Sequence, residues 1–371
     1  MYKISVIMPM YNAKEFVEYS IDSIIRQMPG ELEVVVVDDR STDGSFEYVS
    51  EKYKGNDQVQ IIQQEKNGGP GAARNKGMKC ARGEYISFAD SDDAVREGAY
   101  KAMYDAALKY DAEVVHMTGA VYPVVDDIPK DLTKLNDDEI YFGDTDRGDL
   151  PKEPVMLEND LNDRLEKYLL HKYHWNVWNK LFKKDFLEKY DITFVDMKIA
   201  EDQVFCFSAL FHATRYVINP GNYYIYRIAN ESLSRGVKKP EHMQKYFKSM
   251  FDCIPAMKKV TEDIDFFEQN PDKRMLATDY ILDVIEKAFV AVCYQELGKD
   301  AIKNSGVIRQ IFEEYFGENS YMAEYLFYQG QDRREEAPDL IGMVNSVEFW
   351  RERKRQSLES DKNTEKKNDW D

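Results

Sequence analysis

The chain has few cysteines, no long apolar run and no excess of positive charge. Its four cysteines (Cys80, Cys206, Cys253 and Cys293) include no C-x-x-C pair, so their spacing indicates neither a disulfide framework nor a zinc site. No apolar run reaches the length of about 20 residues that a bilayer-spanning helix needs. The first residues, MYKISVIMPMYN, lack the three regions of a secretory signal peptide. We therefore expect a protein of the reducing cytoplasm.

The balance of charge is acidic. Lys and Arg number 50 and Asp and Glu 68, which gives a formal net charge of −18 at pH 7. Duplex nucleic acid would need a concentrated basic face against this field, so we expect no nucleic-acid partner. The length of 371 residues, with 43% hydrophobic and 32% charged residues, is typical of a folded, enzyme-sized chain with one large domain or two.

Apolar runs alternate with helical patterns over the first 117 residues. The predicted strands are 4–8, 33–37, 59–62, 85–88 and 113–117, and the predicted helices are 13–28, 46–53, 71–81 and 97–110. Strands that alternate with helices in this way predict βαβ units and a parallel sheet.

The pattern changes after residue 121. Residues 121–154 carry four prolines and many acids, which we interpret as a long loop or small insertion, and 217–227 predicts a closing hairpin. From Pro240 to about Phe349, apolar residues recur every three or four positions and predict a separate helical lobe. The domains we expect are 1–235, with halves 1–110 and 111–235, then 236–357, followed by a disordered tail at 358–371.

Two segments place polar residues directly after predicted strands, where ligands bind in open parallel sheets. VIMPMYN puts Pro9, Tyr11 and Asn12 at this edge, although Asn12 could instead cap the following helix. VVVVDDRSTDGS brings Asp38 and Asp39 to the same edge. Either carboxylate could bond the base or ribose of a nucleotide, or could cap the next helix.

Two further segments carry charge suited to a diphosphate. NGGPGAARNKG opens a helix with Arg74 and Asn75, which would favour a pyrophosphate; the alternative is a surface arginine. Arg74 stands where the dinucleotide motif G-x-G-x-x-G has its third glycine, which weakens the case for a dinucleotide-binding site. EYISFADSDDAV gathers Asp90, Asp92 and Asp93, and like charges this close favour a cation such as Mg²⁺ or Mn²⁺. An acidic loop without a ligand is the alternative.

Together the four segments resemble the GT-A-type family 2 glycosyltransferases of bacterial polysaccharide and cell-surface glycan synthesis. The matching motifs are P-x-Y-N at 9–12, V-D-D-x-S-x-D at 37–43, N-x-G-x-x-x-A-R-N at 67–75 and D-x-D at 90–92. The resemblance is close to about residue 120 and thins out to about 235. It implies a GT-A fold, with a Rossmann-like, mostly parallel α/β sheet and, in this chain, an appended C-terminal helical lobe. Residues 1–110 would be the nucleotide-binding half and 111–235 the acceptor half.

The resemblance also implies residue roles. The nucleotide contacts would be Pro9, Tyr11, Asn12, Asp39, Arg74 and Asp90. Asp92 would bind Mn²⁺ or Mg²⁺ at the diphosphate. The pair Glu201–Asp202 in AEDQVF matches the family's general base, with Asp202 the first candidate; a pair that only favours its own helix dipole is the alternative.

Trp175 and Trp178 lie where the resemblance places a segment that faces the acceptor, and an indole can stack on a sugar ring. A pair of core aromatics is the alternative. Arg227 could reach the donor phosphates or form surface salt bridges. The long segment 121–154 would be either a lid ordered by the donor or a loose loop.

The implied activity is inverting and metal-dependent. A sugar would move from a nucleotide diphosphate donor, with UDP expected, to a hydroxyl of a cell-surface glycan or lipid-linked acceptor. A catalytically silent nucleotide-binding partner subunit is the second hypothesis. Peripheral contact with the inner face of the membrane would involve the C-terminal residues Phe349, Trp350, Arg351, Arg353, Lys354 and Arg355, whereas a solvated helix end is the alternative.

Overall fold

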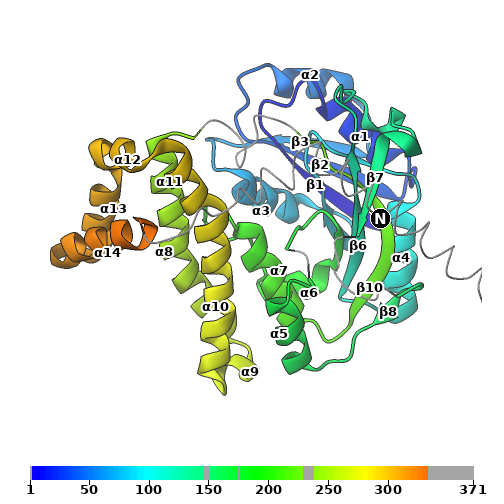
Figure 1. The fold of residues 1–371 in the computed structure, drawn as a ribbon. Coiled ribbons are helices and arrows are strands. Elements are labelled where there is room, and N and C mark those ends of the chain that lie inside the picture. The colour runs from blue at the N-terminus through cyan, green and yellow to red at the C-terminus, as the bar shows by residue number, and fades with distance from the viewer. Residues whose placement is uncertain (1, 145–150, 174, 229–237, 333–371) are drawn as a thin grey trace, which may run out of the picture. The chain divides into compact units, whose positions relative to one another are not determined.

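The computed structural model describes residues 2–144, 151–173, 175–228 and 238–332 (Figure 1). These residues form two compact units. The first contains 2–193 and 209–228, and the second contains 194–208 and 238–332, apart from the gaps just named. The C-terminal cluster Phe349–Arg355, for which membrane contact is predicted, lies outside the described residues.

The first unit is built on one mixed sheet of ten strands. Their order is β3-β2-β1-β4-β9-β6-β10-β5, with β7 paired to β6 and β8 to β10. The bounds are β1 (Ile4–Met10), β2 (Leu32–Asp38), β3 (Val59–Gln63), β4 (Tyr85–Phe88), β5 (Ala94–Val95), β6 (Val114–Pro123), β7 (Ile140–Asp144), β8 (Val155–Met156), β9 (Lys180–Lys183) and β10 (Tyr216–Ile225). Strands β3, β2, β1 and β4 are parallel, and β9 is antiparallel to both of its neighbours. This confirms the α/β prediction.

Helices cover both faces of this sheet, and α3 and α4 lie on opposite sides of it in Figure 1. The helices and short turns of this unit are α1 (Val17–Ile25), α2 (Ser45–Lys52), α3 (Pro70–Cys80), α4 (Ala99–Tyr110), η1 (Leu132–Lys134), η2 (Asp137–Glu139), α5 (Leu161–Leu169) and α6 (Lys184–Lys189). Every residue of β2 is buried, as its run of four valines predicts for a central strand. In α3, a Cβ on Gly77 would lie 2.4 Å from Ile7 Cγ2, so glycine lets this helix approach β1 closely.

Residues 217–227 do not form the predicted hairpin. Residues 217–225 belong to one strand, β10, which runs parallel to β6 and has an irregular register between Asn219 and Tyr224, and residues 226–227 follow this strand. The local turn residues are absorbed into this bulge. Gly119 on β6 leaves room for this bulge, because a Cβ at Gly119 would lie 1.1 Å from Asn222 Oδ1.

The segment predicted as a long loop or small insertion, residues 121–154, forms regular structure in its described part. Strand β6 runs on to Pro123 and pairs with β7, and we call residues 121–144 the inserted hairpin. A small apolar core joins it to the sheet, through Leu132 and Ile140 on the hairpin and Ile225 on β10. This packing excludes the loose-loop alternative for residues 121–144.

The second unit is helical, as predicted for the region after Pro240. Its helices are α8 (Pro240–Glu262), α9 (Asp265–Glu268), α10 (Pro271–Ile285), the π-helix η3 (Glu286–Val290), α11 (Ala291–Leu297), α12 (Lys299–Ser305), α13 (Val307–Phe316), the 3-10 turn η4 (Gly317–Asn319) and α14 (Ser320–Asp332). Met243, Phe247, Cys293, Ile308 and Phe312 form much of its core.

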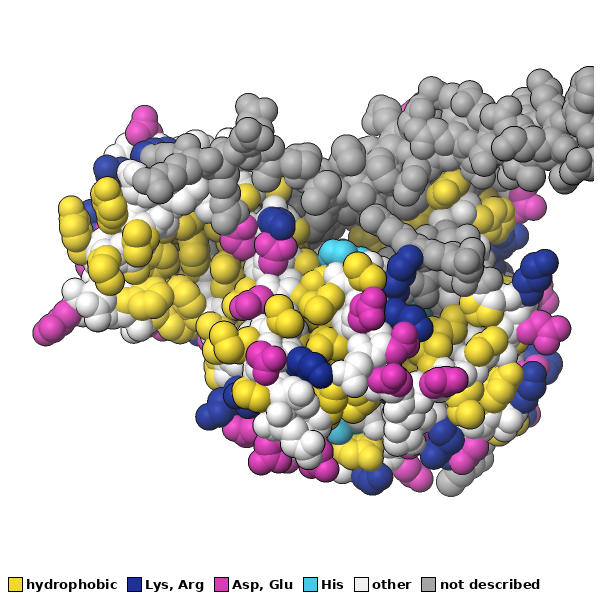
Figure 2. Space-filling view, turned by 60° about the horizontal axis from the view of Figure 1, so that its bottom comes forward, with side chains coloured by type: hydrophobic (Ala, Val, Ile, Leu, Met, Phe, Trp, Pro, Cys, Tyr) yellow, Lys and Arg dark blue, Asp and Glu magenta, His cyan; other side chains and the backbone are white. Residues whose placement is uncertain are grey.

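Several large apolar side chains of α13 and α14 are exposed, and Figure 2 shows hydrophobic side chains gathered at the left of the view, in the region of these helices. They include Phe316, Tyr321, Met322, Tyr325 and Leu326. No helix in the described part of the chain is both long and apolar enough to cross a membrane.

Helix α7 (Glu201–His212) begins in the second unit and ends in the first. Its last turn is capped by Arg164 of α5, which is fully buried. Arg164 Nη1 donates to the carbonyls of Leu210, at 3.0 Å, and Ala213. A cation at a helix C-terminus satisfies carbonyls that lack helical partners and complements the helix dipole. Arg164 therefore stabilises the C-terminal end of α7. The first two residues of this helix, Glu201 and Asp202, are the candidates for the general base.

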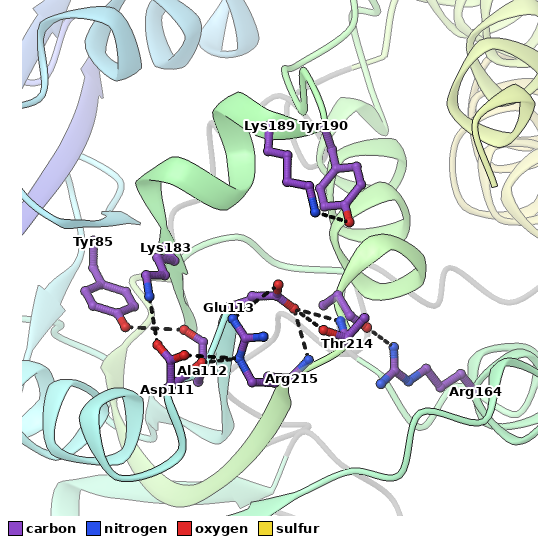
Figure 3. Close-up of polar contacts among 11 residues, drawn as sticks. Tyr85, Asp111, Ala112, Glu113, Arg164, Lys183, Lys189, Tyr190, Thr214 and Arg215 are labelled. Carbon is purple, nitrogen blue, oxygen red and sulfur yellow. Dashed lines mark hydrogen bonds and ion pairs between the residues drawn. The ribbon is translucent and has the colours of Figure 1, made fainter.

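The turn that follows α7 is held by Glu113, just before β6 (Figure 3). Its Oε2 accepts hydrogen bonds from the backbone N–H groups of Thr214, at 2.7 Å, and Arg215, at 3.0 Å. Burial alone would raise the pKa of Glu113, but the hydrogen bonds from Arg215 and Thr214, together with the charge of Arg215, outweigh burial and lower this pKa. The ionised carboxylate thus stabilises the fold.

We expect Glu113→Gln to lower the free energy of unfolding by about 1–3 kcal/mol at pH 7. Because the folded-state pKa is lowered, this stabilisation is present above the unfolded value of about 4.3 and is lost as pH falls through the folded-state value. The difference between variant and wild type should therefore shrink when urea denaturation is repeated at pH 4. Asp105→Asn, at an exposed ion pair with Lys101, is the control and should change little at either pH. A deficit of equal size at both pH values would contradict the assignment.

Candidate active site

The acid loop, residues 90–93, follows β4 at the carboxyl edge of the sheet. Its side facing α1 is held by one hydroxyl: Ser20 Oγ lies 3.0 Å from the carbonyl oxygen of Ser91 and also within hydrogen-bond distance of the carbonyl oxygen of Asp93. Ser20 is 71 residues away from Ser91 in the sequence, so no local pattern could have identified this contact.

Two residues at the end of β10 hold the same loop from the other side. The backbone N–H of Asp90 donates to Tyr224 Oη at 3.0 Å, and Arg227 Nε donates to the carbonyl of Asp92 at 2.8 Å. The backbone N–H of Arg227 donates to Asp93 Oδ1 at 2.7 Å. The sequence analysis missed Tyr224 and gave Arg227 another role. The signal in the sequence was the position of Y-I-Y-R at the end of the predicted hairpin 217–227.

The three aspartates have different surroundings. Asp93 is buried, and burial raises its pKa well above the usual value, with a further increase from the negative charges of Asp92 and Asp90. The side chain of Asp90 is one third exposed and pairs with Arg74, whereas Asp92 is partly exposed. Asp90 and Asp92 are therefore the two carboxylates that a ligand at the surface could reach.

Arg74 is buried beside the acid loop, so the surface-arginine alternative is wrong. Its side chain is 5% exposed, and Nη2 lies 3.0 Å from Asp90 Oδ1. Arg74 lies just after the first turn of α3. Gly69, the residue before this helix, has a positive φ of 87°. The close packing of α3 on β1 at Gly77 fixes this helix. The resulting pair places opposite charges at the edge where a diphosphate is predicted.

Asp39 is largely occupied by the glycine loop before α3. Its Oδ1 accepts from the N–H of Gly68 at 2.7 Å and from Gln64 Nε2 at 2.6 Å, and its Oδ2 accepts from the N–H of Gly69 at 2.7 Å. A carboxylate offers about four acceptor sites, so little capacity remains for a ligand. The structure gives Asp39 a role in shaping this loop, which the sequence analysis missed; its contact with the nucleoside stays a prediction.

The residues that follow β1 contact the segment that follows β2. Asn12 does not cap α1, because that helix begins at Val17; instead Asn12 Oδ1 accepts from the backbone N–H of Thr42 at 2.8 Å. The helix-cap alternative is therefore wrong. Pro9 lies within β1, and Tyr11 is 52% exposed, so its ring is accessible to a planar ligand.

The two tryptophans are in different environments. Trp178 is 7% exposed and stacks on Tyr224, with ring centroids 4.2 Å apart and planes 12° apart. This is the core alternative, and it supports the tyrosine whose hydroxyl holds Asp90. Trp175 is 37% exposed. The acceptor-binding prediction is therefore retained for Trp175 and not for Trp178.

Glu201 and Asp202 occupy the first turn of α7, after Ala200 in a left-handed conformation (φ 63°). Glu201 is buried and Asp202 is partly exposed. An acidic first turn favours its own helix dipole, so this placement agrees with that alternative as well as with the base role.

Within the described residues, no group of three or more His, Cys, Asp or Glu side chains could hold a metal ion by itself. Mg²⁺, however, usually binds one or two carboxylates and completes its shell with water and phosphate oxygens. A partly exposed Asp92 on a loop with a fixed backbone fits that mode. Asp93 fits it poorly, because it is buried and its raised pKa favours the protonated form.

Comparisons with known proteins identify the family and the fold. The model of glycosyl transferase family 2 matches residues 5–157. The uncharacterized glycosyltransferase EpsJ of Bacillus subtilis is 30% identical over 250 residues, which are 66% of this chain and 68% of EpsJ. The poly(ribitol-phosphate) beta-glucosyltransferase of Bacillus spizizenii is 31% identical over 262 residues, which are 69% of this chain but only 37% of that protein.

Among solved structures, S. aureus TarS 1–349 in complex with UDP-GlcNAc has a TM-score of 0.58 and 23% identity, over 84% of this chain and 81% of that one. At this identity the likeness shows the fold alone. The sequence relatives carry the assignment further, since one of them is matched over about two thirds of both lengths. The chain therefore belongs to glycosyltransferase family 2, with the GT-A-like fold that its motifs predicted.

Proposed function

We propose that this glycosyltransferase is inverting and metal-dependent, and that it moves a sugar from a UDP-sugar to a hydroxyl of a cell-surface glycan or lipid-linked acceptor. The observation that carries the proposal is the acid loop. Its backbone is held from two sides, the Arg74–Asp90 pair lies beside it and Asp92 is partly exposed. The relatives support the acceptor class, because two of them are named poly(ribitol-phosphate) glycosyltransferases.

The donor would bind to the nucleotide-binding half, residues 1–110. Its base and ribose would contact Pro9, the ring of Tyr11, Asn12, Asp39 and Asp90, and Arg74 would lie near the diphosphate. A guanidinium matches phosphate oxygens in charge and geometry. TarS, which shares this fold, has been solved with UDP and with UDP-GlcNAc, which makes a uridine nucleotide the first donor to test.

Asp92 would hold Mn²⁺ or Mg²⁺, which when bound supplies Lewis acidity to the leaving diphosphate. The chain itself must then activate the acceptor. Asp202, with Glu201 beside it, would accept the proton of the attacking hydroxyl as its oxygen bonds to the anomeric carbon. A single displacement of the diphosphate inverts the configuration at this carbon. Trp175 would offer a stacking surface to the acceptor sugar.

We expect Asp92→Ala to weaken UDP binding in the presence of Mn²⁺ by roughly 100-fold or more, because it removes the carboxylate that holds the cation at the diphosphate. Calorimetric titration of UDP with and without Mn²⁺ measures this effect. Asp105→Ala removes an exposed aspartate of α4 and should bind UDP as the wild type does. Equal Mn²⁺-dependent affinity in Asp92→Ala and wild type would refute the metal assignment.

We expect Asp202→Asn to keep Mn²⁺-dependent UDP binding but to lower the rate of sugar transfer by about 10²–10⁴-fold, the usual range for loss of a general base. A hydrolysis screen with a panel of nucleotide sugars and Mn²⁺ would first identify the donor. Transfer by Asp202→Asn and Glu201→Gln is then compared at saturating donor. Wild-type turnover by Asp202→Asn would remove it as the base, and loss of transfer only in Glu201→Gln would move the role to that residue.

A further inference from the structure

Arg227 is a buried cation that the proposed mechanism does not use. It is 5% exposed, and in the described part of the chain its guanidinium hydrogen-bonds to backbone carbonyls and not to carboxylates. These carbonyls belong to Asp92, at 2.8 Å, to Pro129, at 2.9 Å, and to Lys130. The guanidinium also lies over the ring of Phe16, 4.3 Å from its centroid. The surface salt bridge considered for Arg227 is therefore wrong.

Burying a positive charge in this environment costs free energy. A buried cation loses its hydration. Without a hydrogen-bonded carboxylate, Arg227 recovers part of this through its carbonyl hydrogen bonds, the aromatic ring and the longer-range attraction of Asp92, Asp93 and Asp131. An apolar side chain could fill the same space without this penalty. The contacts therefore indicate that Arg227 has a role besides stability.

The contacts of Arg227 join two parts of the site region. One is the acid loop, through the Asp92 carbonyl and through Asp93 Oδ1, which accepts from the Arg227 backbone N–H at 2.7 Å. The other is the inserted hairpin, through the carbonyls of Pro129 and Lys130. Because the carbonyl and side chain of Asp92 share one Cα, a fixed carbonyl restricts the directions in which its carboxylate can point.

We propose that Arg227 is a positioning residue for the donor site: it holds the Asp92 carbonyl and ties the acid loop to the inserted hairpin, so that the Asp92 carboxylate is directed toward the cation and diphosphate. This inference rests on the proposed role of Asp92 in metal binding. Arg227 would act through Asp92 and would not itself contact the donor. Its loss should therefore weaken metal-dependent binding of the nucleotide.

Arg96 provides a matched control. It too holds the inserted hairpin, since its Nη2 pairs with Asp137 Oδ1 at 3.2 Å and its guanidinium lies 4.9 Å from the ring centroid of Phe142. Its hydrogen bonds and ring contact do not involve the acid loop. Arg96→Met thus removes a cationic contact with the hairpin and leaves the hold on Asp92 intact.

The experiment is calorimetric titration of UDP in the presence of Mn²⁺ with the full chain, for wild type, Arg227→Met, Arg227→Lys and Arg96→Met. We expect Arg227→Met to weaken Mn²⁺-dependent binding by about tenfold or more, as for the loss of a charged hydrogen bond, with Arg96→Met within about twofold of wild type. Arg227→Lys keeps the charge but not the planar fork, so it should give an intermediate value. Thermal unfolding of each variant reports whether it is folded.

The outcomes separate this inference from the proposed function. If wild type binds UDP no better with Mn²⁺ than without it, the proposed metal role fails. If wild type shows the effect and folded Arg227→Met or Arg227→Lys matches it, the positioning role alone is overturned. An equal loss in Arg96→Met would also overturn it, because the effect would then come from the hairpin. Should neither Arg227 variant fold, Arg227 is structural and the proposal is wrong.

Discussion

The site depends on one constraint: the backbone of the acid loop is fixed while its side chains repel one another. Three carboxylates within four residues would move apart in a free chain, because their like charges disfavour ionisation at close range. Here Ser20, Tyr224 and Arg227 bind the loop's own carbonyl and N–H groups and prevent that. Helix α1 supplies the first anchor, and Tyr224 of β10 and Arg227 just after this strand supply the other two. Strand β10 lies beside the loop because it pairs with β5, which directly follows the loop, so this pairing is a condition for the site.

The fixed backbone lets each carboxylate of the loop take a different partner. Asp93 turns inward to the backbone N–H of Arg227, just after β10. Asp90 turns to Arg74, which α3 can place there because Gly77 allows close packing on β1. Asp92, like Asp90, remains partly exposed. Just after β2, Asp39 also has fixed partners, because its carboxylate accepts hydrogen bonds from the glycine loop before α3. Acids that look equivalent in the sequence thus differ in what they can offer a ligand.

Local patterns predicted strands β1 to β4 and β6, the helical C-terminal region and the edge at which the four motifs gather, because strand and helix periodicity and the ends of parallel strands follow from short stretches of sequence. Contacts between distant segments could not be predicted, as those of Ser20 and Arg227 with the acid loop show. The bulge in β10 was taken for a hairpin because N-P-G-N is a strong turn signal on its own. Only Gly119, on the neighbouring strand, shows that the sheet can accommodate it.

The charges around the acid loop indicate why Arg227 is held by carbonyls. A carboxylate partner would neutralise Arg227 and leave the loop with Arg74 alone against three acids. With carbonyl partners, the positive charge of Arg227 stays available to the loop, where burial first, and then the negative charges of Asp92 and Asp90, raise the pKa of Asp93. Asp92 would then obtain from a bound cation the compensation that Asp90 obtains from Arg74. A cation bound there would add a further positive charge to those of Arg74 and Arg227.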